Sequence, residues 1–113
     1  VRHCAMQSCL PVLPTASPHL PAHPAVFLVE PHGAFAFPAS HFVDITAVEP
    51  EKRRLLSHHV SQEEAMRLAV HSGIGDLSAR LTAFRGEQAG CAHAEAFVPM
   101  PARGAIKAYP VLP

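Results

Sequence analysis

The apolar positions of the chain predict two strands, with a charged turn after the first of them. Residues 25–30 read AVFLVE, an apolar run closed by a carboxylate. Because such a run is apolar on both faces, it is typical of an interior strand of a parallel sheet. Phe42, Val43 and Ile45 are strand-forming residues that predict a second strand over residues 42–45. A helix signal follows directly, and a helix that begins at the end of a strand is typical of an α/β domain.

Polar residues at cap spacing predict where the next helices begin. Thr46 with Glu49, and Ser61 with Glu64, match the capping-box pattern, in which each side chain accepts a hydrogen bond from the other residue's backbone amide. Pro50 falls in the first turn of the earlier helix, whether Thr46 or Glu49 is the capping residue. The helices predicted on this basis cover residues 47–59 and residues 62–71, the second of which breaks at Gly73 and Gly75.

Other patterns predict the flanks of this region. Leu77, Leu81 and Phe84 stand at helical spacing and predict a third helix over residues 77–85, ended by Gly86. The remaining predictions, in chain order, are the end of a helix at residues 2–10, a proline-rich extended loop at 11–24, an edge strand at 91–98 and an extended tail at 99–113. We interpret residues 1–113 as a single partial domain, because a helix signal is already present at the first residues.

Composition and charge exclude several classes of partner. Lys plus Arg and Asp plus Glu number nine each, so no net charge attracts nucleic acid or an acidic membrane. The basic triplet at residues 52–54 is interpreted as a solvated helix face. No apolar run reaches the roughly 18–20 residues that span a bilayer. The cysteines Cys4, Cys9 and Cys91 form no CxxC pair, which favours a reducing, cytoplasmic compartment over a disulfide framework. We therefore expect a cytoplasmic protein that binds neither nucleic acid nor a membrane, whose partner is a small-molecule substrate, and we leave a homo-oligomer open.

Five short motifs occur in an order that resembles the C-terminal half of one enzyme family. They are Glu30-Pro-His, Val43-Asp-Ile-Thr46, His59-x-Ser-Gln62, Arg85-Gly86 and Ala94-Glu-Ala-Phe97. This set resembles the LmbE/PIG-L family of zinc-dependent N-acetylglucosaminyl deacetylases, and it covers roughly residues 25–98. The resemblance implies a fold, namely the C-terminal part of a Rossmann-like parallel-sheet domain.

The resemblance also implies a zinc hydrolase mechanism. In that mechanism a zinc-bound water attacks an acetamide carbonyl, a carboxylate acts as general base and a histidine steadies the oxyanion. The family holds Zn²⁺ with a His-Pro-Asp-Asp motif and a later His-x-Asp-His motif, and neither occurs in this sequence. We therefore expect the Zn²⁺ ligands to lie before Val1, and we assign no metal ligand within the chain.

The candidate substrate-binding residues are Glu30, His32, Arg85, His93 and Glu95. Glu30 and His32 follow the first predicted strand, and open parallel sheets bind ligands at the carboxyl ends of their strands. A structural role is the alternative for this turn, with Glu30 accepting hydrogen bonds from backbone amides of the turn and His32 pointing to water. His93 stands where the family usually has tyrosine, so a step that depends on tyrosine is not carried over to this chain.

Several residues are assigned structural roles instead. Asp44 lies beside a helix N-terminus, where the helix dipole and local amides stabilise a carboxylate. Ser61 is interpreted as a helix cap and not as a nucleophile. His19 and His23 are separated by proline, which prevents the helical spacing of a metal-binding pair. Two alternatives to the deacetylase stay open: a lyase of the same family that resembles 4-oxalomesaconate hydratase, and a truncated product without activity.

Overall fold

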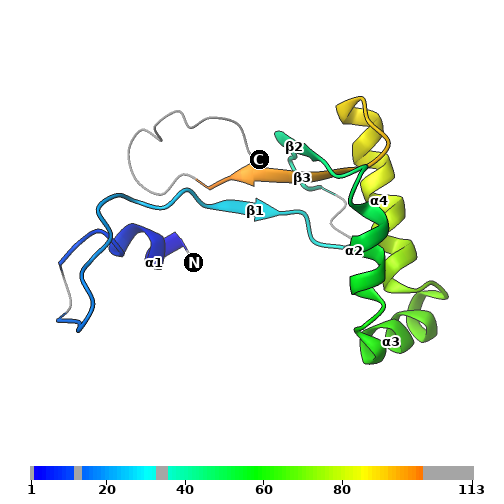
Figure 1. The fold of residues 1–113 in the computed structure, drawn as a ribbon, viewed down its shortest axis with the longest axis horizontal. Helices are drawn as coiled ribbons and strands as arrows, with labels where there is room; N and C mark the ends of the chain where they lie inside the picture. Colours follow the sequence, from blue (N-terminus) through cyan, green and yellow to red (C-terminus); the bar gives the residue numbers. More distant parts are fainter. Residues whose placement is uncertain (1, 12–13, 33–35, 101–113) are drawn as a thin grey trace.

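The computed structural model describes residues 2–11, 14–32 and 36–100 of the chain. Strands and helices both contribute, so the α/β class predicted from the hydrophobic pattern is confirmed (Figure 1). In chain order the elements are α1 (Arg2–Gln7), β1 (Phe27–Val29), β2 (His41–Asp44), α2 (Glu49–Leu56), α3 (Val60–Val70), α4 (Ile74–Ala89) and β3 (Ala94–Pro99).

The sheet is antiparallel, so the prediction of a parallel, Rossmann-like sheet is wrong. The strand order is β1-β3-β2, and β3 pairs antiparallel with both of its neighbours. Phe97 of β3 lies opposite Val29 on one side and opposite His41 on the other. The two outer strands therefore run in the same direction, as strands of a parallel sheet would, but the last strand of the chain lies between them. Strand composition does not reveal this order, because β preference reflects the neighbours that a strand finds in the folded protein.

The positions of two strands within the sheet also correct the prediction. The apolar run of residues 25–30 predicts an interior strand, yet β1 is at the edge, with Leu28 44% and Val29 58% exposed. Residues 91–98 predict an edge strand, yet β3 is central. Two of its alternate residues are nearly inaccessible, since Ala94 is 0% and Ala96 is 2% exposed. Small side chains at alternate positions let a helix pack closely on that face of the sheet.

The helices α2, α3 and α4 gather at one end of the sheet (Figure 1). α4 contacts β3 and β2, while α2 and α3 both contact α4 (Figure 1). Among the described residues the buried apolar side chains are few and mostly small, namely Ala5, Ile45, Ala94 and Ala96. Ala94 and Ala96 belong to the strand on which α4 packs, so the core at this end is a thin layer between α4 and the sheet.

The first predicted capping box does not form. α2 has Val48 at its N-cap position and no side-chain cap bond, although Pro50 does lie in the first turn as predicted. The Thr46 hydroxyl instead binds the backbone of His93, the residue before β3. It accepts a hydrogen bond of 3.1 Å from the His93 amide and donates one of 3.4 Å to the His93 carbonyl. The Thr46 side chain, which the local pattern predicts to cap the helix, therefore makes a tertiary contact instead.

The second capping box is also absent. Ser61 lies inside α3, whose N-cap residue is His59 and which has no side-chain cap bond. The helix ends at His71 in the left-handed conformation (φ 56°), before the predicted glycine break. Glu63 connects α3 to the next helix, because its carboxylate accepts a hydrogen bond of 2.8 Å from the Ile74 amide. Glu63 thus satisfies one of the amides that the start of α4 leaves without a partner inside the helix.

α4 extends beyond its predicted end at Gly86. The helix continues to Ala89 and is followed by Gly90 in the left-handed conformation (φ 76°). Gly86 serves a different purpose inside the helix. A Cβ atom at this position would lie 2.6 Å from the carbonyl oxygens of both Cys91 and Ala92. Glycine is needed here because the chain that enters β3 passes directly over α4.

The most buried side chains of α4 are polar, whereas the sequence predicts an apolar stripe. The buried residues of this helix are Ser78, Thr82, Arg85 and Gly86. Phe84, which belongs to the predicted stripe, is 51% exposed. Buried polar groups need partners or accessible space, so this face is where a binding site is expected.

Among the described elements, α1 contacts no other helix or strand. α1 is shorter than the predicted helix over residues 2–10, and residues 14–24 form neither helix nor strand, in agreement with the predicted loop at 11–24. Of the predicted tail at 99–113, only Pro99, at the end of β3, and Met100 lie within the described residues. No helix in the described part of the chain is long and apolar enough to cross a membrane.

Candidate functional site

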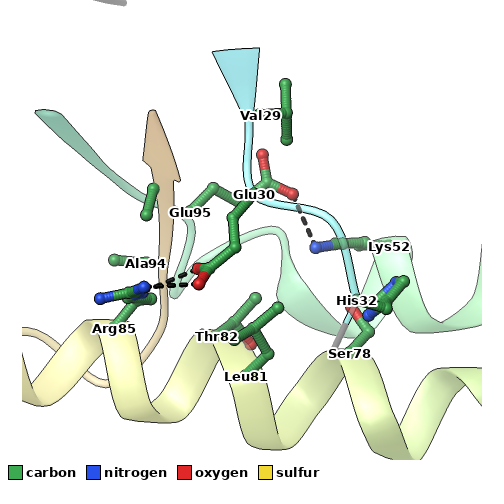
Figure 2. Close-up of a pocket in the computed structure, with 11 residues that line it drawn as sticks. Val29, Glu30, His32, Lys52, Ser78, Leu81, Thr82, Arg85, Ala94 and Glu95 are labelled. Carbon is green, nitrogen blue, oxygen red and sulfur yellow. Dashed lines mark hydrogen bonds and ion pairs between the residues drawn. The ribbon is translucent and has the colours of Figure 1, made fainter. Parts of the chain in front are cut away.

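A cavity of about 210 Å³ is lined by residues of α4, of β3, of α2 and of the chain around the end of β1. Figure 2 shows the side chains that surround it. Four of the five candidate residues line this cavity: Glu30, His32, Arg85 and Glu95. They are separated by up to 65 positions in the sequence, which is the difference between residues 95 and 30. The structure therefore brings most of the predicted set together, although the sheet that holds it is not the predicted one.

Glu30 and Arg85 form a buried ion pair at one side of the cavity. Arg85 Nε donates to Glu30 Oε2 over 2.7 Å, and Arg85 Nη2 donates to Glu30 Oε1 over 2.5 Å. The Arg85 side chain is only 9% exposed and the Glu30 side chain only 5%. Arg85 Nη1 also donates to Gln88 Oε1 over 2.7 Å. The hydrogen bonds from Arg85 to the Glu30 carboxylate raise the pKa of Arg85, which favours the charged guanidinium. The structural alternative predicted that Glu30 binds the amides of its own turn. Its carboxylate binds Arg85 instead.

Lys52 and Glu95 form a second ion pair, which is partly exposed. Lys52 Nζ donates to Glu95 Oε1 over 2.6 Å, and the two side chains are 30% and 31% exposed. This contact joins α2 to β3 beside the cavity (Figure 2). Lys52 therefore leaves the solvated face predicted for residues 52–54. Its neighbours stay outside the cavity, because Arg53 pairs with Asp76 and Arg54 pairs with Glu51.

His93, the fifth candidate, contacts the site indirectly. Its ring nitrogen Nδ1 lies 3.0 Å from the hydroxyl oxygen of Thr82, and Thr82 lines the cavity. The Thr82 hydroxyl also donates to the Ala79 carbonyl over 3.1 Å. Because that hydroxyl has one proton, it accepts from a protonated Nδ1 whenever it donates to Ala79. His93 is thus attached to the wall of the cavity and is not part of its lining.

The cavity also contains polar groups that have no protein partner. His32 is exposed, and it makes no hydrogen bond or ion pair within the described residues. Ser78 is 3% exposed, and its hydroxyl likewise has no hydrogen-bond partner in the described part of the chain. Both side chains line the cavity (Figure 2). These groups, unlike the two ion pairs, are available to a ligand.

Sequence reasoning missed three polar residues of the cavity, Lys52, Ser78 and Thr82. Ser78, Thr82 and the predicted Arg85 lie at positions i, i+4 and i+7 of one helix, which places them on one face. The same periodicity applied to polar residues would have identified this face. Lys52 has no such signal, because its role depends on Glu95, which is 43 positions away in the sequence.

The described residues do not form a zinc site. No group of three or more His, Cys, Asp and Glu side chains is arranged to hold a metal ion within residues 2–11, 14–32 and 36–100. Both carboxylates of the cavity, Glu30 and Glu95, are already paired with cations. No chemical step of this chain can therefore be derived through a metal bound to its own described residues.

Asp44 stands apart from the cavity and has a local role. Its Oδ1 atom accepts a hydrogen bond of 2.9 Å from the Thr46 amide. Hydrogen bonding from Thr46 holds the pKa of Asp44 below its ordinary value. Asp44 therefore stabilises the turn between β2 and α2, as the structural interpretation predicts.

Comparison of the chain with family models, with curated proteins and with solved structures found no match. The resemblance to the LmbE/PIG-L family thus depends on the five motifs alone. Two of these motifs, Glu30-Pro-His and Arg85-Gly86, have structural explanations in this fold. Arg85 balances the charge of Glu30, and Gly86 allows the close approach of the chain at Cys91 and Ala92.

Proposed function

We propose that the chain provides the substrate-binding part of a zinc-dependent deacetylase that acts on N-acetylglucosamine-type or related amides. The observation that supports this proposal best is the convergence of Glu30, His32, Arg85 and Glu95 on one cavity. Glu30, His32, Arg85 and Glu95 also belong to the motifs that resemble the deacetylase family. In this proposal the Zn²⁺ is held by residues outside positions 1–113, and the protein is cytoplasmic.

The charge of the cavity suits a neutral ligand such as an amide. Its two cations, Lys52 and Arg85, are each paired with a carboxylate at 2.6 Å or less. His32 is then the remaining ionisable group of the lining. A neutral acetamido group needs no counter-charge, so it can enter without breaking either ion pair. A charged ligand would compete with a partner that is already in place.

The size of the cavity suits a small part of a substrate. Its volume of about 210 Å³ is below the roughly 300–1,000 Å³ typical of pockets that hold a whole drug-sized ligand. Val29, Leu81, Ala94 and Ala96 supply apolar surface for a methyl group. We therefore assign the cavity to the acyl end of the substrate, with the remainder of the substrate outside it.

Binding of two matched sugars tests the proposal. N-acetylglucosamine and glucosamine differ in the acetyl group, so only the former should shift the backbone NMR signals of Ser78, Ala94 and Ala96. Equal shifts with both sugars would contradict the assignment of the cavity to the acyl group. Shifts confined to residues far from the cavity would contradict it as well.

A hydratase acting on a dicarboxylic or tricarboxylic acid is the second candidate. It is favoured by the presence of two cations, Lys52 and Arg85, in the same cavity. Such an enzyme would use Lys52 for a substrate carboxylate, because Lys52 is the more exposed of the two. Parallel assays of the parent enzyme, for acetate release from the amide and for hydration of an unsaturated acid, distinguish the two reactions. The same assays test whether the chain belongs to an inactive product.

A further inference from the structure

Ser78 differs from the other polar residues on the inner face of α4. It is 3% exposed, so it is more than nine-tenths buried. Arg85 on the same face binds Glu30, and the Thr82 hydroxyl binds the Ala79 carbonyl and lies against His93. The Ser78 hydroxyl makes no hydrogen bond within the described residues.

The missing partner of Ser78 is unusual for a helical serine. A serine inside a helix usually donates to the carbonyl three or four residues earlier, as Thr82 does here. A buried hydroxyl without a hydrogen bond is unfavourable. In the described residues no completely inaccessible side-chain oxygen or nitrogen lacks a partner. The Ser78 oxygen therefore retains some accessible surface, and the space that this residue borders is the cavity.

The surroundings of Ser78 define what it can bind. His32 also lines the cavity and makes no polar contact with any described residue (Figure 2). The charged residues of the lining, Glu30 with Arg85 and Glu95 with Lys52, neutralise each other. A ligand in this cavity therefore meets two hydrogen-bonding side chains without a protein partner, Ser78 and His32, and an apolar wall.

We infer that Ser78 is a ligand-recognition residue, and that its hydroxyl, together with His32, binds the polar atoms of a small neutral amide. The hydroxyl can donate to the amide carbonyl oxygen, and the apolar wall accommodates the methyl group. The identity of the ligand as an N-acetyl group depends on the proposed function. The role of Ser78 as the recognition group depends only on its burial, its free hydroxyl and its place in the cavity.

Ser78→Ala separates a binding role from a structural one. Because the hydroxyl has no protein partner, its removal should leave the midpoint of thermal unfolding unchanged or higher. The affinity for acetamide and for N-acetylglucosamine, measured by NMR titration of the 113-residue chain, should fall at least about tenfold. Ser61→Ala is the matched control, because Ser61 is an exposed helical serine away from the cavity. It should change neither affinity.

His32→Ala provides a second test in a residue that folding does not require. His32 is exposed, so this variant should fold normally and bind both probes more weakly than the parent chain.

Equal affinities of the parent chain and Ser78→Ala would overturn the role of Ser78 and leave the proposed function standing. A lower unfolding midpoint for Ser78→Ala would also overturn it, because the hydroxyl would then have a structural partner. Binding that depends on Ser78 in a protein whose parent enzyme releases no acetate would support Ser78 and reject the deacetylase. Absence of binding by both probes would overturn the inference itself.

Discussion

The Arg85 guanidinium donates two hydrogen bonds to the Glu30 carboxylate, and these bonds join the end of β1 to α4. The partners are 55 positions apart in the sequence, and their side chains are almost completely buried. Two parallel N–H···O bonds of this kind fix orientation as well as charge. The pair therefore holds the edge strand against the helix and defines one wall of the cavity.

Glu30→Gln should destabilise the protein by about 3 kcal/mol, because it leaves the buried Arg85 cation without a counter-charge. Urea denaturation measures the loss. The control is Glu51→Gln, which removes an ion pair to Arg54 whose side chains are both more than half exposed, and which should cause no measurable change. The double variant Glu30→Leu/Arg85→Met should recover most of the stability, because it removes both charges. A Glu30→Gln variant as stable as the parent chain would show that the pair is not buried in solution.

Gly86→Ala should destabilise the protein by about 2 kcal/mol, because a Cβ would meet two backbone carbonyl oxygens that cannot move away independently of β3. Gly90→Ala provides the comparison. Gly90 has open space around its Cβ position, but its φ of 76° strains any other residue, so a loss of about 1 kcal/mol is expected. Chemical denaturation of both variants checks the order of the two effects. A larger loss at Gly90 than at Gly86 would contradict the close approach of α4 to Cys91 and Ala92.

Ser61→Ala should leave stability unchanged or raise it by up to about 0.5 kcal/mol, because alanine has the higher helix propensity. The capping-box pattern alone predicts the opposite, a loss of about 0.5–2 kcal/mol. The structure reverses the sign because Ser61 lies inside α3 and makes no cap bond. Thermal unfolding of the variant decides between the two. A clear loss of stability would place the start of the helix at Ser61.

Asp44 should titrate below its ordinary pKa of 3.8, because the hydrogen bonds from Thr46 favour the charged carboxylate. The folded-state pKa is lowered, so the stabilising effect is complete above the unfolded-state value. It is lost as the pH falls through the folded-state value. Carboxyl NMR titration measures the shift directly. Asp44→Asn should reduce the pH dependence of unfolding in the acid range, and a normal or raised pKa in the parent chain would exclude the turn described here.

The existence of most elements could be predicted from the sequence, because short-range periodicity determines them. Strand residues such as Phe42 and Val43 lie in β2, and Pro50 lies in the first turn of α2. The helix boundaries could not be predicted to the same degree. Thr46 and Ser61 have the right residue type for caps, but Thr46 contacts His93 and Ser61 lies within a helix. Gly86 looks like a helix end and is instead a point of close packing.

The candidate site was predicted in part. Glu30, His32, Arg85 and Glu95 meet at one cavity, whereas Ser78 and Lys52 were missed. No sequence motif marks Ser78, because what distinguishes it is a buried hydroxyl without a hydrogen-bond partner among the described residues. That property exists only after the helix has packed against the sheet.

The sequence by itself determined the α/β class, the approximate strands and helices, and most of the polar residues of the cavity. Each of these depends on residue type and on spacing over a few positions. Only the tertiary structure decided that β3 lies between β1 and β2, and that the polar face of α4 turns inward. Both results depend on contacts between residues far apart in the chain. Ala94 and Ala96 are small enough to let α4 approach, and Arg85 finds in Glu30 the charge that allows its burial.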